Sequence, residues 1–327
     1  AGDEVRVVAP ARSMAVMTQN ARAFALERMQ GELGLKVTFG KHVEERDRDF
    51  SSAIESRLAD LHEAFADKNV KAVMPVFGGF NSVELLGGVD FGLIRRNPKI
   101  ICGYSDVTTL VNAIYARTGL VTFSGPMYSN FGMKRGFEYT MEHFKKAVMG
   151  TVRHKVHPSA NWSNDSWYKD QDKREFIANQ GSISLKLGKA KGTIVGGNLC
   201  SLALLQGTSN MPKLDGSILF LEEAEDNAEV TRMFFLRQLS SLFQLPGAEK
   251  IRGIVFGRFE KNTKITVEDL KESIARSKAV SKLNIPIIAG ADFGHTTPCF
   301  TFGIGGTAEI NASTSGSSIT FEPFVKA

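Results

Sequence analysis

Cysteine and histidine are scarce in this sequence, which limits the kinds of site it can hold. Three cysteines, Cys102, Cys200 and Cys299, give an odd count with no CxxC pair. This argues against a disulfide framework and against a zinc knuckle. There are six histidines, and no His, Asp or Glu pair has the i, i+4 spacing of a helical metal site on an apolar face. We therefore expect no metal ion and no cofactor.

Long apolar runs and long runs of one charge are also missing. No uncharged apolar run approaches the ~18 residues that a membrane-spanning helix needs. The net charge is 40 − 35 = +5, but basic and acidic residues are interspersed, which favours an ordinary solvated surface. No GxGxxG or Walker pattern lies at a strand-to-helix junction, so dinucleotide or triphosphate binding is not indicated. We expect a cytoplasmic protein without nucleic-acid or membrane partners.

The chain does contain alternating strand and helix patterns in an ordinary globular composition. Its 327 residues are 43% hydrophobic and 23% charged, enough for two domains of ~150 residues. In the first half, strands are expected at Val5–Ala9, Lys36–Phe39, Lys71–Phe77 and Lys99–Gly103, with helical segments between them. This alternation predicts βαβ crossovers, and hence an α/β fold with a mostly parallel sheet flanked by helices.

The pattern breaks in a polar stretch and then resumes. Residues 157–181 lack clear periodicity and hold both tryptophans, which is typical of a linker or a functional loop. From Gly192 strands and helices alternate again, and the tail after Phe300 has the two-residue period of β-hairpins. We predict an N-terminal α/β domain over 1–157, a connecting loop over 158–190, and a second α/β domain with C-terminal hairpins over 191–327.

Ser105 carries the sharpest local signal. In the segment ICGYSDVTTL a buried strand enters a tight glycine-containing turn and a helix starts at once, which is the geometry of a nucleophile elbow. The amide of Asp106, at the helix start, would then point at a developing oxyanion. The segment is not GxSxG, because Val107 stands two residues after the serine. The alternative is a plain helix N-cap, where Ser and Asp are both favoured.

Gly78 and Gly79 follow another buried strand, in the segment VFGGF. Two adjacent glycines permit unusual φ values and a close approach of the backbone to a ligand. A second oxyanion donor would then come from the amide of Gly79. The alternative is an ordinary strand-to-helix turn.

His295 is the histidine best placed for catalysis. It ends the segment IPIIAGADFGH in a glycine-rich turn, and strand ends are where sites form in open α/β sheets. Glu222 directly follows the apolar strand SILFL and competes with Glu223, Glu225 and Asp226 to orient a histidine in a Ser-His-acid arrangement. The alternatives are a solvent-facing turn histidine and a charged loop that caps the next helix.

These motifs together resemble the LD-carboxypeptidase family of serine peptidases, in particular its branch of microcin C immunity proteins. The resemblance extends over nearly the whole chain. Each motif alone is weak, whereas the set in the family's order is specific. The motifs are VFGGFNSVELL at Gly78-Gly79, CGYSDVTTL at Ser105, FSGPM at Gly125-Pro126, VGGNLCSLALLQGT from Val195, LFLEEAED at Glu222 and GADFGHTTP at His295.

The resemblance implies a catalytic triad of Ser105, Glu222 and His295, with the backbone amides of Gly79 and Asp106 as the oxyanion hole. The glutamate follows the serine by 222 − 105 = 117 residues, and the histidine follows the glutamate by 295 − 222 = 73 residues. These gaps place the nucleophile in the first domain and its partners in the second, so the site would lie in the cleft between them. Members of the family commonly form homodimers.

Two kinds of substrate are implied. One branch of the family trims LD-linked peptidoglycan peptides, and the immunity-protein branch cleaves the amide that joins an aminoacyl group to a nucleotide. The loop NWSNDSWYKDQDKREF is similar to that of the second branch, and an indole stacks well on a purine. We expect an aminoacyl- or peptidyl-nucleotide substrate, contacted by Asn198 and stacked on Trp167, with Trp162 packing the loop down.

Two alternatives remain open. Each tryptophan is equally compatible with a half-buried loop anchor, and activity on peptidoglycan tetrapeptides would place the protein in the other branch. A non-catalytic module that binds a nucleotide or a peptide, with Ser105 only capping a helix, is the alternative of another class. Such a module would not need Ser105 and His295 to lie close together.

Overall fold

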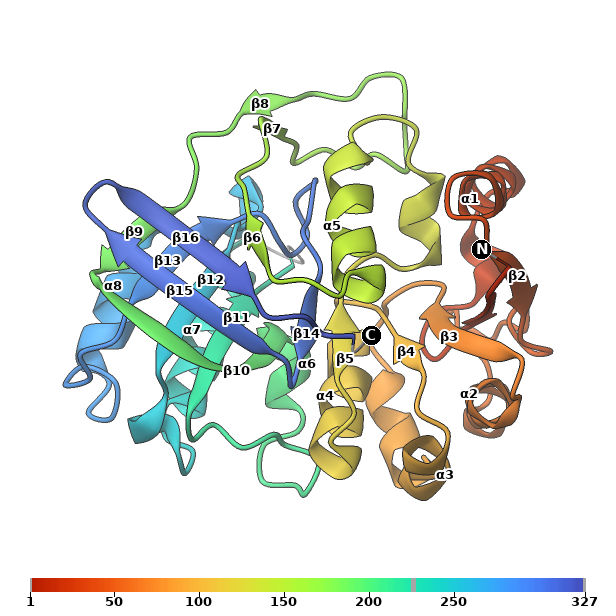
Figure 1. Cartoon of the computed structure of the whole chain (residues 1–327), viewed down its shortest axis with the longest axis horizontal. Coiled ribbons are helices and arrows are strands. Elements are labelled where there is room, and N and C mark those ends of the chain that lie inside the picture. The colour runs from red at the N-terminus through yellow and green to blue at the C-terminus, as the bar shows by residue number, and fades with distance from the viewer. Residues whose placement is uncertain (1, 225–227, 326–327) are drawn as a thin grey trace.

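The computed structural model describes residues 2–224 and 228–325, and the side chains of all of these except 228 and 229. Two β-sheets lie side by side, with helices packed around them (Figure 1). Within the described part of the chain, none of the helices combines the length and the apolar character needed to cross a membrane. None of the three cysteines forms a disulfide.

The smaller sheet is parallel throughout, as the sequence predicts, with the strand order β2-β1-β3-β4. All five residues of β1 are buried, because a central parallel strand is covered on both faces. Its strands are β1 (Glu4–Val8), β2 (Lys36–Phe39), β3 (Val70–Pro75) and β4 (Ile100–Ile101). The helices of this half are α1 (Gln19–Gly31), α2 (Ile54–Ala66), α3 (Phe91–Arg96), α4 (Val107–Thr118) and α5 (Glu138–Met149).

The larger sheet has eight strands in the order β6-β16-β15-β10-β11-β12-β13-β9. Strands β10 to β13 are parallel, and every residue of β11 and β12 is buried. The strands are β6 (His154–Val156), β9 (Ile183–Lys186), β10 (Gly188–Asn198), β11 (Ser217–Glu222), β12 (Gly253–Gly257), β13 (Ile287–Ala291), β15 (Thr307–Ser313) and β16 (Gly316–Phe321). The helices are α6 (Leu199–Ala203), α7 (Ala228–Leu242) and α8 (Val267–Arg276).

Strands β15 and β16 form the predicted C-terminal hairpin, so the α/β class with a parallel sheet and terminal hairpins is confirmed. Two short ladders complete the fold: β5 (Thr122–Ser124) with β14 (Phe302–Ile304), and β7 (Asn161–Trp162) with β8 (Ile177–Ala178). Short 3-10 helices lie at η1 (Met14–Val16), η2 (Ser82–Gly87), η3 (Tyr128–Gly132), η4 (Ala248–Lys250) and η5 (Lys261–Thr263).

Several pairings join segments that are far apart in the sequence. The stretch 158–190, expected as a connecting loop, contains β7, β8, β9 and the first residues of β10. Strand β6, which precedes this stretch, lies at an edge of the larger sheet, and β14 pairs with β5 from the first half of the chain. The division at residues 157 and 190 stays a prediction.

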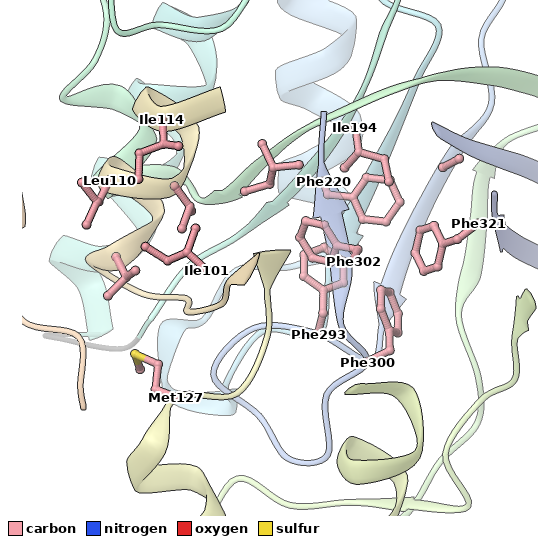
Figure 2. Close-up of a cluster of buried hydrophobic side chains, with 14 of the residues drawn as sticks. Ile101, Leu110, Ile114, Met127, Ile194, Phe220, Phe293, Phe300, Phe302 and Phe321 are labelled. Carbon is pink, nitrogen blue, oxygen red and sulfur yellow. The ribbon is translucent and has the colours of Figure 1, made fainter. Parts of the chain in front are cut away.

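An aromatic cluster fills the core beside the larger sheet. Figure 2 shows Phe220 from β11, Phe302 from β14 and Phe321 from β16 packed with Phe293 and Phe300. The ring centroids of Phe220 and Phe302 are 4.9 Å apart, and those of Phe293 and Phe300 are 5.4 Å apart. The turn between residues 293 and 300 is thus held against the sheet by apolar packing at both of its ends.

Candidate active site

The turn between β4 and α4 holds Ser105 in a strained backbone conformation. Its φ is 61°, in the left-handed region that non-glycine residues rarely adopt. The helix cap is Asp106, the residue after the serine, and its side chain does not cap the helix. The side chain of Ser105 is therefore presented by a strand-to-helix elbow, and the plain N-cap alternative does not describe it.

Gly78 is required because the backbone passes close to this serine. An added Cβ at Gly78 would lie 2.7 Å from Ser105 Cβ, 2.8 Å from Ser105 Oγ and 3.4 Å from the amide nitrogen of Asp106. Neither Gly78 nor Gly79 has a positive φ, so this glycine pair does not use the left-handed backbone region that it could adopt. Close approach alone accounts for Gly78.

The Gly-Gly loop is fixed to the serine turn by two hydrogen bonds. The backbone N–H of Ser82 donates to Asp106 Oδ2 at 2.9 Å, and the Ser82 hydroxyl donates to the carbonyl oxygen of Asp106 at 2.7 Å. Burial raises the pKa of Asp106 above its usual value, although hydrogen bonds from Ser82 act in the opposite direction. The backbone that carries the amides of Gly79 and Asp106 is therefore held in place before any ligand arrives.

The structure brings the Ser105 hydroxyl, the His295 imidazole and the Glu222 carboxylate into one hydrogen-bonded line. His295 Nε2 lies 3.0 Å from Ser105 Oγ, and His295 Nδ1 lies 2.7 Å from Glu222 Oε2. Glu222 is the last residue of β11, and His295 follows β13 in the same sheet. With the Nδ1 proton donated to the carboxylate, Nε2 is free to accept the serine proton.

Glu222 is almost completely buried, with 3% of its side chain exposed, and His295 is 17% exposed. Burial lowers the pKa of His295, but the charge and hydrogen bond of Glu222 outweigh it and raise that pKa to about 9. The second carboxylate oxygen, Oε1, has no hydrogen-bond partner among the described residues. Among the described residues, the His295 imidazole is thus the hydrogen-bond partner of the Glu222 carboxylate.

Glycine at 294 gives the carboxylate its space. Gly294 has a φ of 108°, and an added Cβ there would lie 2.7 Å from Glu222 Oε2. At Gly257, at the end of β12, an added Cβ would lie 3.0 Å from Glu222 Cβ. A larger residue at position 294 would press on the Glu222 carboxylate, and one at position 257 would also clash with the carbonyl oxygen of Phe293, 2.5 Å from the added Cβ.

Glu223 points away from the imidazole. Its Oε1 accepts a hydrogen bond from Asn198 Nδ2 at 2.9 Å, and its Oε2 accepts one from the N–H of Cys200 at 3.1 Å. Burial and the charge of Glu222 raise the pKa of Glu223 to about 7. The geometry therefore favours Glu222 as the histidine's partner. The other two competitors, Glu225 and Asp226, lie outside the described residues.

Asn198 caps a helix. Its Oδ1 accepts hydrogen bonds from the N–H and the hydroxyl of Ser201 at the start of α6, and its Nδ2 holds Glu223. Only 4% of Asn198 is exposed. This side chain positions Glu223, the neighbour of Glu222, and it has little surface left for a substrate.

Tyr104 belongs to the site and was missed from the sequence. Its ring lies 5.2 Å from the His295 ring, and its hydroxyl accepts a hydrogen bond from Asn130 Nδ2 at 3.2 Å. Burial raises the pKa of this tyrosine. A cavity of about 30 Å³ lies beside it, lined among others by Asn130, Thr296 and Cys299. That volume is enough for one or two water molecules.

The tryptophan-bearing segment is bonded directly to the histidine turn. The N–H of Ser163 donates to the carbonyl of Thr297 at 2.6 Å, and the N–H of Thr297 donates back to the carbonyl of Ser163 at 3.1 Å. Asp292 anchors the same segment, because it accepts hydrogen bonds from the N–H of Ser159 and the amide of Asn179. The segment and the turn that carries His295 are therefore one hydrogen-bonded unit.

The two tryptophans lie in different surroundings. Trp162 lies beneath two cations, with Arg258 Cζ 5.0 Å and Lys261 Nζ 5.6 Å from its ring centroid. Trp167 is half-buried against the apolar cluster of the N-terminal half, and its ring meets that of Tyr168 edge-on at 6.0 Å. Trp162 is thus packed against cationic side chains from the segment that follows β12.

Sequence comparison identifies the family. The LD-carboxypeptidase N-terminal domain matches residues 5–125, and the LD-carboxypeptidase C-terminal domain matches residues 191–310. The chain belongs to the LD-carboxypeptidase family. Within this family, YocD of Bacillus subtilis (strain 168) is 45% identical over 318 residues, 97% of this chain and 96% of that protein. The Escherichia coli microcin C7 self-immunity protein MccF is 30% identical over 335 residues, 98% of this chain and 93% of that protein.

Solved structures show the same fold in this family. The crystal structure of an MccF-like protein from Bacillus anthracis str. Ames matches with a TM-score of 0.95 at 50% identity, over 98% of this chain and 97% of that one. MccF in complex with aspartyl sulfamoyl adenosine matches with a TM-score of 0.87 at 27% identity, over 100% of this chain and 98% of that one. The LD-carboxypeptidase and immunity-protein resemblance of the sequence is confirmed.

The strain at Ser105 predicts opposite stability effects of alanine and glycine. Ser105→Ala and Ser105→Gly both remove the hydroxyl, but only glycine relieves the positive φ. We expect Ser105→Gly to exceed Ser105→Ala in free energy of unfolding by about 1 kcal/mol, measured by urea denaturation. In helix α7, the matched pair Ser240→Gly and Ser240→Ala should show the reverse order. Equal stability of the two Ser105 variants would contradict the strained elbow.

Proposed function

We propose that this protein is a serine carboxypeptidase that hydrolyses the amide of aminoacyl- or peptidyl-nucleotides, with Ser105, His295 and Glu222 as its triad. The observation that carries the proposal is the hydrogen-bonded line from Ser105 Oγ to His295 Nε2, and from His295 Nδ1 to Glu222 Oε2. Three residues separated by 117 and 73 positions in the sequence meet there. The residues present supply nucleophile, base and orienting acid, and the proposed reaction calls on no cofactor.

In the first half of the reaction the serine is acylated. Ser105 Oγ attacks the carbonyl carbon of the substrate amide while its proton passes to His295 Nε2. Glu222 keeps the imidazole in the required tautomer and stabilises the imidazolium that forms. The carbonyl oxygen becomes an oxyanion, which accepts hydrogen bonds from the amides of Gly79 and Asp106. The C–N bond then breaks, and the leaving nitrogen takes the proton from His295.

In the second half, water releases the acyl group. His295 accepts a proton from a water molecule, whose oxygen attacks the acyl carbon and forms a second oxyanion. The bond between that carbon and Ser105 Oγ breaks, and the serine oxygen takes the proton back from His295. The products are a carboxylic acid and the amine-bearing fragment, and the enzyme returns to its starting state.

The proposed substrate class is based on the ligands bound in structures of a relative, MccF. MccF has been solved in complex with aspartyl sulfamoyl adenosine and with glutamyl sulfamoyl guanosine. In this chain, Trp162 is held by Arg258 and Lys261, which supports Trp167 as the residue that stacks on the base. The family's own name supports the second candidate, an LD-carboxypeptidase acting on peptidoglycan tetrapeptides. The homodimer, the cytoplasmic location and a site in a cleft between domains remain parts of the proposal.

Turnover of two substrates tests the function. The protein is incubated with an aminoacyl-sulfamoyl adenosine and with an LD-tetrapeptide, and products are followed by mass spectrometry. We expect cleavage of the nucleotide compound, and a kcat lowered ~10⁴–10⁶-fold by Ser105→Ala with binding retained. Cleavage of the tetrapeptide alone would move the protein to the cell-wall branch. Binding without cleavage by the unaltered protein would support the non-catalytic module.

The pH dependence of the reaction tests the role of Glu222. Only neutral His295 accepts the serine proton, and Glu222 raises the pKa of that histidine to about 9. We therefore expect kcat/KM to rise with pH through neutrality and to level off near that pKa. Glu222→Gln removes the negative charge, so the rise should shift to lower pH, with a smaller loss of kcat than Ser105→Ala causes. An unchanged pH profile would rule out Glu222 as the charge that raises the pKa of the His295 imidazole.

Replacement of Trp167 tests the recognition of the base. A stacking contact contributes ~1–3 kcal/mol, so Trp167→Ala should raise KM for the aminoacyl-adenosine analogue roughly tenfold to a hundredfold. Trp167→Phe, which keeps an aromatic face, should lose less. Any activity on an LD-tetrapeptide should be nearly unchanged in both variants. Equal losses on the two substrates would show that the indole is only a structural anchor.

A further inference from the structure

A cluster of potential metal ligands lies outside the triad, between α5 and the segment that follows β6 (Figure 1). Glu142 and His143 are neighbours in α5, and His157 lies just beyond β6. One ligand atom from each of the three lies within 4.8 Å of the others. His157 Nε2 and Glu142 Oε1 are 3.0 Å apart.

His143 is the unusual member of this cluster. It is fully buried, and neither of its ring nitrogens has a hydrogen-bond partner among the described residues. A buried polar group without a partner is costly and rare. A metal ion would supply the partner that one of these ring nitrogens lacks.

We propose that Glu142, His143 and His157 form a zinc-binding site that anchors the start of the tryptophan-bearing segment. Two imidazoles and one carboxylate are a ligand set that Zn²⁺ prefers, with water in the fourth position. Zn–N and Zn–O bonds of about 2.0–2.2 Å place tetrahedral ligands roughly 3.4 Å apart. The 3.0 Å pair is about 0.4 Å closer than this spacing, and all three ligand atoms lie within 4.8 Å of one another, so side-chain rotations would be needed to place them around one ion.

The contacts that His157 makes away from the proposed metal position are those expected of a metal ligand. Its Nδ1 lies 3.3 Å from the carbonyl oxygen of Pro158, and metal-bound histidines usually donate their other ring N–H in this way. The hydroxyl of Tyr139 donates to the His157 carbonyl at 2.7 Å, which fixes the backbone. About half of the His157 side chain is exposed, so an ion can enter from solvent.

Lys146 and His154 are the other titratable groups next to the cluster. Lys146 Nζ donates to Glu142 Oε1 at 2.5 Å, so the ammonium competes with zinc for that oxygen. The ring of His154 lies 6.3 Å from that of His143, and its Nε2 is buried without a hydrogen-bond partner among the described residues. Zinc binding would thus displace Lys146 from Glu142 while His154 stays beside the site.

This proposal revises the expectation of no metal site. That expectation considered helical i, i+4 pairs, whereas Glu142 and His143 are adjacent and His157 comes from beyond β6. The consequence is local stiffening, because His157 lies two residues before Ser159, whose N–H donates to Asp292 at 2.8 Å. Zinc would join α5 to this segment, which is itself bonded to the turn of His295.

Calorimetric titration with zinc chloride tests the site, using the untagged full chain after treatment with a chelator. We expect one zinc ion per chain, and an affinity at least ~10-fold weaker in His157→Ala and in Glu142→Gln, because each loses one ligand. These two side chains are partly exposed, so both variants should fold, as circular dichroism would check. Lys146→Met should bind more tightly, because the competing ammonium is gone. His62→Ala, a change remote from the cluster in sequence and contacts, serves as the matched histidine control.

Two further readouts separate this site from adventitious binding. Cobalt in place of zinc should give a visible absorption band of a four-coordinate ion, absent in His157→Ala. Zinc should raise the midpoint of thermal unfolding more in the unaltered chain than in that variant. No zinc binding at ~100 μM, or binding that His157→Ala and Glu142→Gln leave unchanged, would overturn the proposal. Binding lost only in His295→Ala would overturn it as well, since the ion would then lie at the triad.

Discussion

The hydrogen bond between the Glu222 carboxylate and the His295 imidazole is the interaction on which the site depends. A buried carboxylate is unfavourable unless a charge or a hydrogen bond compensates for it. Here one oxygen accepts from the imidazole at 2.7 Å and the other has no partner among the described residues. The side chain that relieves Glu222 is therefore the same one that faces Ser105. Stability of the buried acid and orientation of the base are two results of one contact.

The surrounding fold preserves that contact through apolar packing and small residues. Phe293 and Phe300 hold the histidine turn at both ends within the aromatic cluster, and Gly294 lets that turn pass close to the carboxylate. On the serine side, Gly78 allows the same close approach, and Ser82 fixes Asp106. Each half of the site is thus held by contacts of its own, and one apolar cluster contains buried residues from both sheets and joins the two halves.

Much of the fold and of the site could be predicted because the signals are local. The βαβ alternation revealed the parallel sheets, and the ordered motifs around Ser105, Glu222 and His295 pointed to the residues that the structure brings together. Glu222 was preferred to Glu223 because it directly follows the apolar run SILFL. In the structure it is the last residue of β11, and the alternation of faces turns the next residue the other way.

What could not be predicted depends on contacts between distant segments. The edge strands β6 and β9 are short, and only their pairing in the larger sheet defines them. Tyr104 stands beside Ser105 in the sequence, but its packing on His295 is a tertiary contact. Asn198 was expected to touch substrate, and its role as a helix cap that also holds Glu223 follows from the fold of β10 and α6.

The two backbone hydrogen bonds between Ser163 and Thr297 have a consequence for how the substrate specificity of such an enzyme could change. These two hydrogen bonds tie the tryptophan-bearing segment, which in the proposed function contacts the nucleotide, to the turn that carries His295. Replacing this segment with that of a relative would therefore also move His295, unless the hydrogen bonds between residues 163 and 297 are kept. The segment and the residues that form these two hydrogen bonds would have to be exchanged together.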